Sequence, residues 1–327
     1  MKKIYLPVIL GVIIILFVSL WPNKKENELT KIKVSEVAHS IFYAPMYVSK
    51  NLGYFEEEGL DIEILLGNGA DKVTASVLSG DVQIGFCGSE STLYVYNQGE
   101  KDYLINFAAL TKKDGSFIVA KNKQEVFNIE NLKGKHIIAG REGGMPAMTL
   151  EWTLNEHGIK KDDLYFDTSI AFSAMGGTFI SGIGDYVALF EPTASEIEKQ
   201  GYGKIVASLG ELGGIVPYTT FHAKKSYIES NPEIIKKFTK AINKGLDYVH
   251  SHTSDEIAKA IQKDFSDLNI SDLSNIIERY SNIDSWFTST YIYEEDFKHV
   301  EEIVKNSGFL EKDNNYNKLV DNKFNQE

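Results

Sequence analysis

Polar side chains directly follow several apolar strands in this sequence, and their types and spacing could bind a small ligand. Glu191 ends the apolar run 186–190, where a charge is costly unless it is paired or faces a cleft. Arg141 could clamp a carboxylate, sulfonate or phosphate with two parallel hydrogen bonds, although it could also be a surface cation. Ser89 and Glu90 open a predicted helix, where ordinary helix capping explains them equally well. We take Glu191 as the strongest candidate for a ligand contact.

Further candidates come from the other loops expected at the same edge of a sheet. Phe42 and Tyr43 are either core residues or aromatic rings that stack on a ligand. Asn68 lies between two glycines, which allow close backbone approach, but a plain strand-to-helix turn accounts for this motif too. The candidate ligand-binding residues are therefore His39, Phe42, Tyr43, Asn68, Ser89, Glu90, Arg141, Glu142 and Glu191.

Composition argues against several other kinds of chemistry. The sequence has one cysteine, Cys87, so neither an internal disulfide nor a cysteine-based metal site is expected, and its seven histidines lack metal-ligand spacing. No Gly-x-Ser-x-Gly motif of a hydrolase is present. A net charge of −12 disfavours nucleic-acid binding. We predict no catalytic residues, no metal and no cofactor.

Apolar strands alternate with helices along most of the chain, which predicts an α/β protein with parallel sheets covered on both faces. In the first half we predict strands at 33–38, 61–66, 82–86 and 103–110, and helices at 45–51, 71–78 and 89–97. In the second half we predict strands at 136–139, 164–167, 186–190, 204–207 and 217–223, and helices at 129–132, 145–156, 173–180 and 193–200. Helices at 232–250, 255–264, 271–280 and 294–306 follow. The same order in both halves suits two similar lobes.

The N-terminus has the pattern of an export signal. Lys2 and Lys3 precede an apolar run from Ile4 to Trp21, and a polar segment follows. The run is about long enough to cross a bilayer, and no pair of small residues marks a cleavage site. We therefore favour an uncleaved membrane anchor over a cleaved signal peptide, with the chain after Thr30 on the extracytoplasmic side of the cell membrane.

The segment 39–62, HSIFYAPMYVSKNLGYFEEEGLDI, resembles the opening of a superfamily of ABC transporter substrate-binding proteins. These are the nitrate, sulfonate, bicarbonate, taurine and thiamine-precursor (THI5-like) binding proteins. The similarity continues through 67–71, 79–85, 131–135, 140–143 and 191–192. Many surface-anchored members carry a lipid on a cysteine that this chain lacks, and the apolar segment 4–21 could substitute for it.

The resemblance implies a two-lobed, periplasmic-binding-protein-like (type II) fold, with two doubly wound sheets joined by two crossover strands. We place the crossovers near 116–120 and 217–223. Residues 1–30 would be the anchor and linker, 31–117 plus 221–327 lobe one, and 118–220 lobe two. The resemblance also implies a monomer that hands a small-molecule ligand to a cognate ABC permease and ATPase.

The candidate loops carry three carboxylates, Glu90, Glu142 and Glu191, against the single cation Arg141. Nitrate or bicarbonate would be repelled by this arrangement, so we predict an organic solute such as a pyrimidine-type vitamin precursor or a related heterocycle or amine. An alkanesulfonate or taurine held by Arg141 is the alternative. THI5-like enzymes make a pyrimidine with iron held by a cysteine-rich motif, which a chain with one cysteine cannot supply. An extracellular sensor or adhesion domain on the same scaffold is a further alternative.

Overall fold

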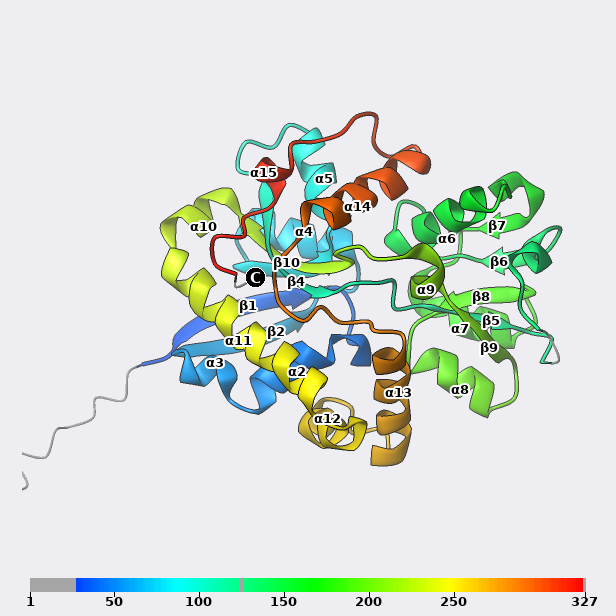
Figure 1. Cartoon of the computed structure of the whole chain (residues 1–327), viewed down its shortest axis with the longest axis horizontal. Coiled ribbons are helices and arrows are strands. Elements are labelled where there is room, and N and C mark those ends of the chain that lie inside the picture. The colour runs from blue at the N-terminus through cyan, green and yellow to red at the C-terminus, as the bar shows by residue number, and fades with distance from the viewer. Residues whose placement is uncertain (1–27, 124–125, 326–327) are drawn as a thin grey trace, which may run out of the picture.

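The computed structural model describes residues 28–123 and 126–325 and contains two five-stranded sheets, one in each lobe (Figure 1). The first sheet has the order β2 (Leu60–Leu66), β1 (Thr30–Glu36), β3 (Ile84–Gly88), β10 (Thr219–Lys224), β4 (Leu104–Thr111). The second has the order β7 (Tyr165–Asp167), β6 (His136–Ile138), β8 (Tyr186–Leu189), β5 (Phe117–Ala120), β9 (Lys204–Ser208). We call the elements around the first sheet lobe one and those around the second lobe two.

The chain passes between the sheets twice, from β4 to β5 and from β9 to β10. Strands β5 and β10 run antiparallel to both of their neighbours, so each sheet is mixed, and these two strands depart from the parallel arrangement expected from the sequence. The reason is topological: parallel neighbours are joined by a crossover connection, usually a helix, whereas β5 and β10 enter from the other lobe and are free to run antiparallel. The division of the chain into lobes at 118 and 221 stays a prediction.

Helices cover both faces of each sheet. Those of lobe one are α2 (Ala44–Asn51), α3 (Tyr54–Glu57), α4 (Ala70–Ser79), α5 (Glu90–Asn97), α10 (Lys225–Ser230), α11 (Pro232–Ser251), α12 (Ser254–Ile261), α13 (Ile270–Asn282), α14 (Glu294–Asn306) and α15 (Tyr316–Leu319). Those of lobe two are α6 (Met145–Glu156), α7 (Met175–Ile180), α8 (Thr193–Lys199) and α9 (Leu209–Gly213). Short 3₁₀ helices are η1 (Ile41–Tyr43), η2 (Ile129–Leu132), η3 (Lys161–Asp163), η4 (Phe172–Ala174) and η5 (Gln262–Asp264).

The long helix α11 illustrates how the sequence pattern produces this packing. Ile235, Phe238, Ile242 and Leu246 recur at helical spacing and are fully buried. The Phe238 ring meets Phe221 of β10 at a centroid distance of 5.0 Å, so the helix lies against the first sheet. Burying aromatic and branched apolar side chains of this kind stabilises each lobe by about 1.5–3 kcal/mol per residue.

No helix within residues 28–123 and 126–325 combines the length and apolar character needed to cross a bilayer. The predicted anchor at 4–21 lies outside the described residues.

Candidate ligand-binding site between the lobes

The lobes meet where strands of both sheets end, and aromatic rings fill the centre of this interface. The Phe42 ring in η1 lies 5.9 Å from that of Phe190, the residue after β8, and 5.1 Å from that of Tyr280 in α13. Phe42 is fully buried and Tyr43 is 3% exposed, against the ring of Phe86. Phe42 therefore lies at the interface between the lobes and Tyr43 lies beside it in lobe one, both as packed rings and not as exposed rim residues.

Glu90 places a carboxyl group in the interior at the start of α5, directly after β3. The residue is 4% exposed, and its Oε2 has no hydrogen-bond partner among the described residues. The hydroxyl of the neighbouring Ser89, which is fully buried, is also without a partner in the described part of the chain. Gly88 makes this arrangement sterically feasible, because a Cβ there would lie 2.0 Å from Glu90 Oε2. Burial raises the pKa of Glu90 from its ordinary 4.5 to about 7, and the charge of Arg141 opposes that rise.

Asp114 brings a second carboxyl group to the same region from the segment after β4. Its Oδ1 accepts hydrogen bonds from Ser116 N at 2.7 Å and Ser116 Oγ at 2.6 Å. Burial raises the pKa of Asp114 to about 6, whereas the hydrogen bonds from Ser116 lower it, and its Oδ2 has no hydrogen-bond partner among the described residues. Burial is the main cause that raises the pKa of Tyr218, and the charges of Asp114, Tyr43 and Glu90 raise it further. The side chains of Tyr218 and these three residues therefore lie close enough to interact. Two buried carboxyl groups beside two phenols favour a ligand that presents N–H or O–H donors.

Glu191 lies on the lobe-two side of the interface, and its carboxylate is fully paired. Oε1 accepts hydrogen bonds from Arg279 Nη1 at 2.8 Å and from Ser195 Oγ at 2.8 Å, and Oε2 accepts one from Ser195 N at 2.9 Å. Burial raises the pKa of Glu191, and the charge of Arg279 in α13 opposes this. Because Arg279 belongs to lobe one, this ion pair holds the lobes together, and a ligand contact through Glu191 stays a prediction.

Tyr280 adds a second bridge beside that ion pair. Its hydroxyl donates to Gly115 O at 3.1 Å and accepts from Glu191 N at 3.2 Å. One buried phenol thus connects the β4–β5 segment with Glu191, two residues after β8.

His39 lies in a polar network within lobe one. Its Nδ1 is 3.1 Å from Glu36 Oε1, and its Nε2 is 2.8 Å from the backbone oxygen of Asp264. The Tyr47 hydroxyl donates to Glu36 Oε2 at 2.5 Å. The hydrogen bond with Glu36 is the main reason that the pKa of His39 is raised. The imidazole therefore ties the end of β1 to η5.

The remaining candidates lie at the periphery. Asn68 is exposed, with a φ of 56°, in the turn between β2 and α4. Arg141 of lobe two pairs with Asp71 of lobe one at 2.8 Å, with side chains 52% and 61% exposed. Glu142 is exposed beside it. The structure thus brings Phe42, Tyr43, Ser89 and Glu90 together, whereas Asn68, Arg141 and Glu142 lie outside that group.

Asp114, Tyr218, Arg279 and Tyr280 are residues of this interface that sequence reasoning missed. Asp114 follows the apolar strand β4 closely, which is the same signal that identified Glu191. Arg279 lies in helix α13, 88 positions after its partner Glu191, and nothing in the local sequence marks it as a partner.

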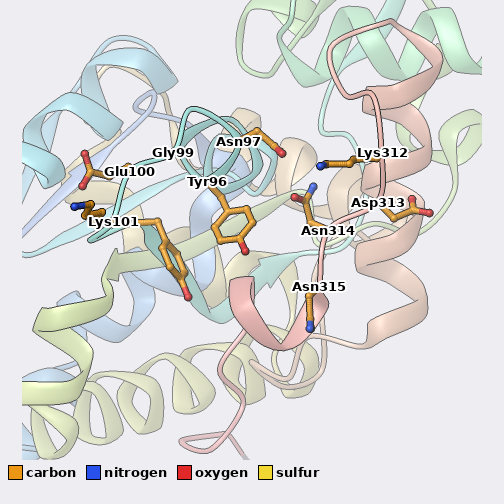
Figure 2. A pocket seen from close by; sticks show the side chains of 10 residues that line it. Tyr96, Asn97, Gly99, Glu100, Lys101, Lys312, Asp313, Asn314 and Asn315 are labelled. Atoms are coloured by element: carbon orange, nitrogen blue, oxygen red, sulfur yellow. The ribbon is translucent and has the colours of Figure 1, made fainter.

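A cavity of about 560 Å³ lies elsewhere, between the end of α5 and the segment that joins α14 to α15 (Figure 2). Charged groups of both signs line it, including Glu100, Lys101, Lys312 and Asp313. It contains none of the candidate residues.

The family of the chain follows from a sequence comparison. The model of the family described as NMT1/THI5 like matches residues 41–255. The chain belongs to this family. The match spans η1 to the start of α12 and confirms the resemblance seen in the sequence. All candidate residues except His39 lie within it.

Individual relatives of this NMT1/THI5-like chain include binding proteins and enzymes. It is 45% identical over 308 residues to the protein named "Putative binding protein YtlA" of Bacillus subtilis (strain 168), covering 94% of this chain and 92% of that protein. It is 28% identical over 227 residues to the 4-amino-5-hydroxymethyl-2-methylpyrimidine phosphate synthase of Candida albicans (strain WO-1), spanning 64% of each protein.

Among solved structures, the chain is similar to the alkanesulfonate-binding protein SsuA from Xanthomonas axonopodis pv. citri bound to MOPS. The TM-score is 0.72 at 14% identity, and the match covers 90% of this chain and 99% of that one. This likeness confirms the two-lobed, periplasmic-binding-protein-like fold predicted for the family.

Proposed function

We propose that this chain is the extracytoplasmic solute-binding receptor of an ABC importer, whose two lobes close on a small organic solute. The 45% identity to a protein named as a binding protein and the fold shared with an alkanesulfonate-binding protein support this proposal. A cognate ABC permease and ATPase would receive the solute. Attachment to the cell membrane through residues 4–21, and a monomeric receptor, belong to the same proposal.

One observation supports the solute class: neither Glu90 Oε2 nor the Ser89 hydroxyl, both buried, has a hydrogen-bond partner among the described residues. An unsatisfied buried acceptor costs about 1–3 kcal/mol, which a ligand donor at this position would recover. Amidine-like edges and amines, as in aminopyrimidines, supply such donors. A pyrimidine-type vitamin precursor or a related heterocycle or amine is therefore the solute class we propose.

An alkanesulfonate or taurine is the second candidate, and the fold shared with the Xanthomonas protein is the observation that favours it. Such an anion needs several donors. Arg141, the cation predicted to bind it, is half exposed and engaged with Asp71, whereas the buried groups nearby are the acidic side chains Glu90 and Asp114. The electrostatics of the described residues support a donor-bearing ligand better than an anion.

Binding without catalysis is the activity we propose, although pyrimidine phosphate synthases are among the relatives. The family resemblance assigns those enzymes an iron held by a cysteine-rich motif. This chain has one cysteine, Cys87, and burial raises the pKa of its thiol, which keeps the thiol protonated.

Calorimetry on residues 28–327 with 4-amino-5-hydroxymethyl-2-methylpyrimidine, taurine and nitrate tests the proposal. We expect the pyrimidine to bind, and Glu90→Gln to weaken its binding by about 1.5–3 kcal/mol through loss of a charged hydrogen bond. Arg141→Ala should have a smaller effect, and Glu191→Gln tests whether the Glu191 carboxylate also contacts the solute. Taurine binding that is abolished by Arg141→Ala and unaffected by Glu90→Gln would replace the proposed solute class with the anion.

Closure is tested separately by small-angle scattering. A solute bound between two lobes shifts an open–closed equilibrium toward the closed form, so the radius of gyration should fall when it binds. A solute that raises the melting temperature without changing this radius would contradict the two-lobe closure.

A further inference from the structure

A second cavity, of about 250 Å³, lies between α6 of lobe two and the C-terminal end of α14 of lobe one. Figure 1 shows these two helices next to each other, where the lobes meet along one side of the molecule. Glu142, Met148 and Phe166 line the cavity from lobe two, and Ser307 and Phe309 line it from the segment that ends α14. The cavity contains neither Glu90 nor Asp114, so it is separate from the site described above.

The charges in this cavity leave one carboxylate uncompensated. Glu151 pairs with Lys161 at 3.0 Å, and its side chain is 12% exposed. Glu142 has no hydrogen bond or ion pair with any residue that the structure describes. The lining therefore carries an excess negative charge at Glu142, which attracts a cation.

A neutral polar group and an apolar surface complete the lining. The Oγ atom of Ser307 is shielded from solvent and has no hydrogen-bond partner in the described chain, so it can accept from an N–H or donate to a ligand oxygen. Phe166, Met148 and Phe309 supply apolar surface, and the Phe309 ring approaches Gly143, where a Cβ would lie 3.3 Å from it. A cavity of this size admits a single ring with a short side chain.

We propose that this cavity binds a small organic amine, with its ammonium group at Glu142 and its apolar body between Phe166 and Phe309. The site is distinct from the proposed solute site and carries a regulatory ligand. An ammonium group gains a charged hydrogen bond and attraction to the aromatic faces, whereas a carboxylate would be repelled.

The position of the cavity couples this ligand to lobe closure. Asn155 Nδ2 of α6 donates to Asn306 Oδ1 of α14 at 3.1 Å, and the Tyr94 hydroxyl of α5 donates to Gly143 O at 3.0 Å. These bonds join the two walls, so the cavity has this shape only while the lobes are in contact. A ligand that binds this cavity stabilises the closed form, in which the lobes are in contact, because it binds that form more tightly. The solute also favours the closed form, so the solute and the amine should increase each other's affinity.

Phenethylamine is a suitable probe for the full-length chain in detergent, with phenylethanol and phenylacetate as neutral and anionic controls. Calorimetry should show binding of phenethylamine alone. Glu142→Gln should weaken this binding about tenfold, the loss typical of one charged hydrogen bond. Phe309→Ala should also weaken it. Glu63→Gln, an exposed glutamate of β2, is the matched control and should change nothing.

Glu90→Gln separates this site from the proposed solute site. Amine binding that depends on Glu142 and not on Glu90 supports the second site, even if the solute proposal fails. Binding lost only in Glu90→Gln would assign the amine to the solute site and overturn the inference, as would no binding at all.

The coupling is tested by the double variant Asn155→Cys and Asn306→Cys. Phenethylamine should accelerate disulfide formation between these positions, because it holds the two helix ends together. An unchanged rate in the presence of bound amine would refute the coupling.

Discussion

Glu90→Gln should stabilise the folded protein at alkaline pH, although it removes a residue proposed to bind the ligand. The Glu90 carboxyl group is buried, and no described side chain donates to its Oε2. Ionising it in the folded state is therefore costly, which is why burial raises its pKa to about 7. Glutamine has nearly the same shape and carries no charge, so the substitution removes this cost.

The sign and size of the effect follow from proton linkage. Between the ordinary pKa of 4.5 and the folded-state pKa of about 7, the folded protein holds a proton at Glu90 that the unfolded chain has released. The free energy of unfolding therefore falls as the pH rises through this window and levels off above it. At about 1.4 kcal/mol per pH unit the full loss is about 3 kcal/mol. At pH 8 Glu90→Gln should be more stable than the wild type by up to this amount, and at pH 4.5 the two should be nearly equal.

Urea unfolding at pH 5 and pH 8, on wild type, Glu90→Gln and the exposed control Glu63→Gln, measures the effect. Only the difference between proteins counts, because other groups titrate in the same range, including Asp114 with a pKa of about 6. If wild type and Glu90→Gln lose stability in parallel between the two pH values, the pKa of Glu90 is not raised by burial in the folded protein.

Three further predictions concern the contacts between the lobes and the N-terminus. Arg279→Gln should weaken solute binding about tenfold in calorimetry, although Arg279 does not contact the solute, because a charged hydrogen bond between the lobes is lost. We take about 1.5 kcal/mol for this bond, the low end of the usual range, since Arg279 is 31% exposed. An unchanged affinity would contradict this prediction. Arg141→Ala and Asp71→Ala should each cost at most about 1 kcal/mol in urea unfolding, less at high salt, and a larger or salt-independent loss would argue against a simple surface pair. The full-length chain should fractionate with membranes and the chain without residues 1–27 should not; a soluble product that begins between 19 and 28 would show cleavage instead.

Most of the secondary structure and the general position of the site could be predicted from sequence. Alternating apolar runs predicted most of the strands and helices to within a few residues, and the resemblance at 39–62 supplied the two-lobed arrangement. The short helices α3, α9, α10 and α15 were missed, because four to six residues are too few for a periodic pattern to develop. The antiparallel direction of β5 and β10 was missed as well, since strand direction depends on which lobe the chain enters from.

The partners of charged side chains were not predictable in the same way. The sequence predicted that the charge of Glu191 must be paired or face a cleft. Glu191 is 2% exposed, so its charge is indeed buried. Its partner Arg279 lies on a helix far along the chain, and only the packing of α13 against lobe two brings them together. Local sequence shows that a charge must be paired, whereas tertiary structure decides whether the pair is internal.

Three buried glutamates at strand ends show how the structure separates structural from ligand-binding charges. Glu36 receives the Tyr47 hydroxyl and lies beside His39, and Glu191 receives Arg279 and Ser195, so the protein itself compensates both. Glu90 is buried to a similar degree, yet its Oε2 and the adjacent Ser89 hydroxyl have no partner among the described residues. An acceptor left in this state lowers the stability of the folded protein, and selection for folding alone would replace the residue, for instance with leucine. The cost is explained if Glu90 is retained for a donor that arrives with the solute. The same reasoning makes the pH dependence of Glu90→Gln and its loss of solute binding two consequences of one buried carboxyl group.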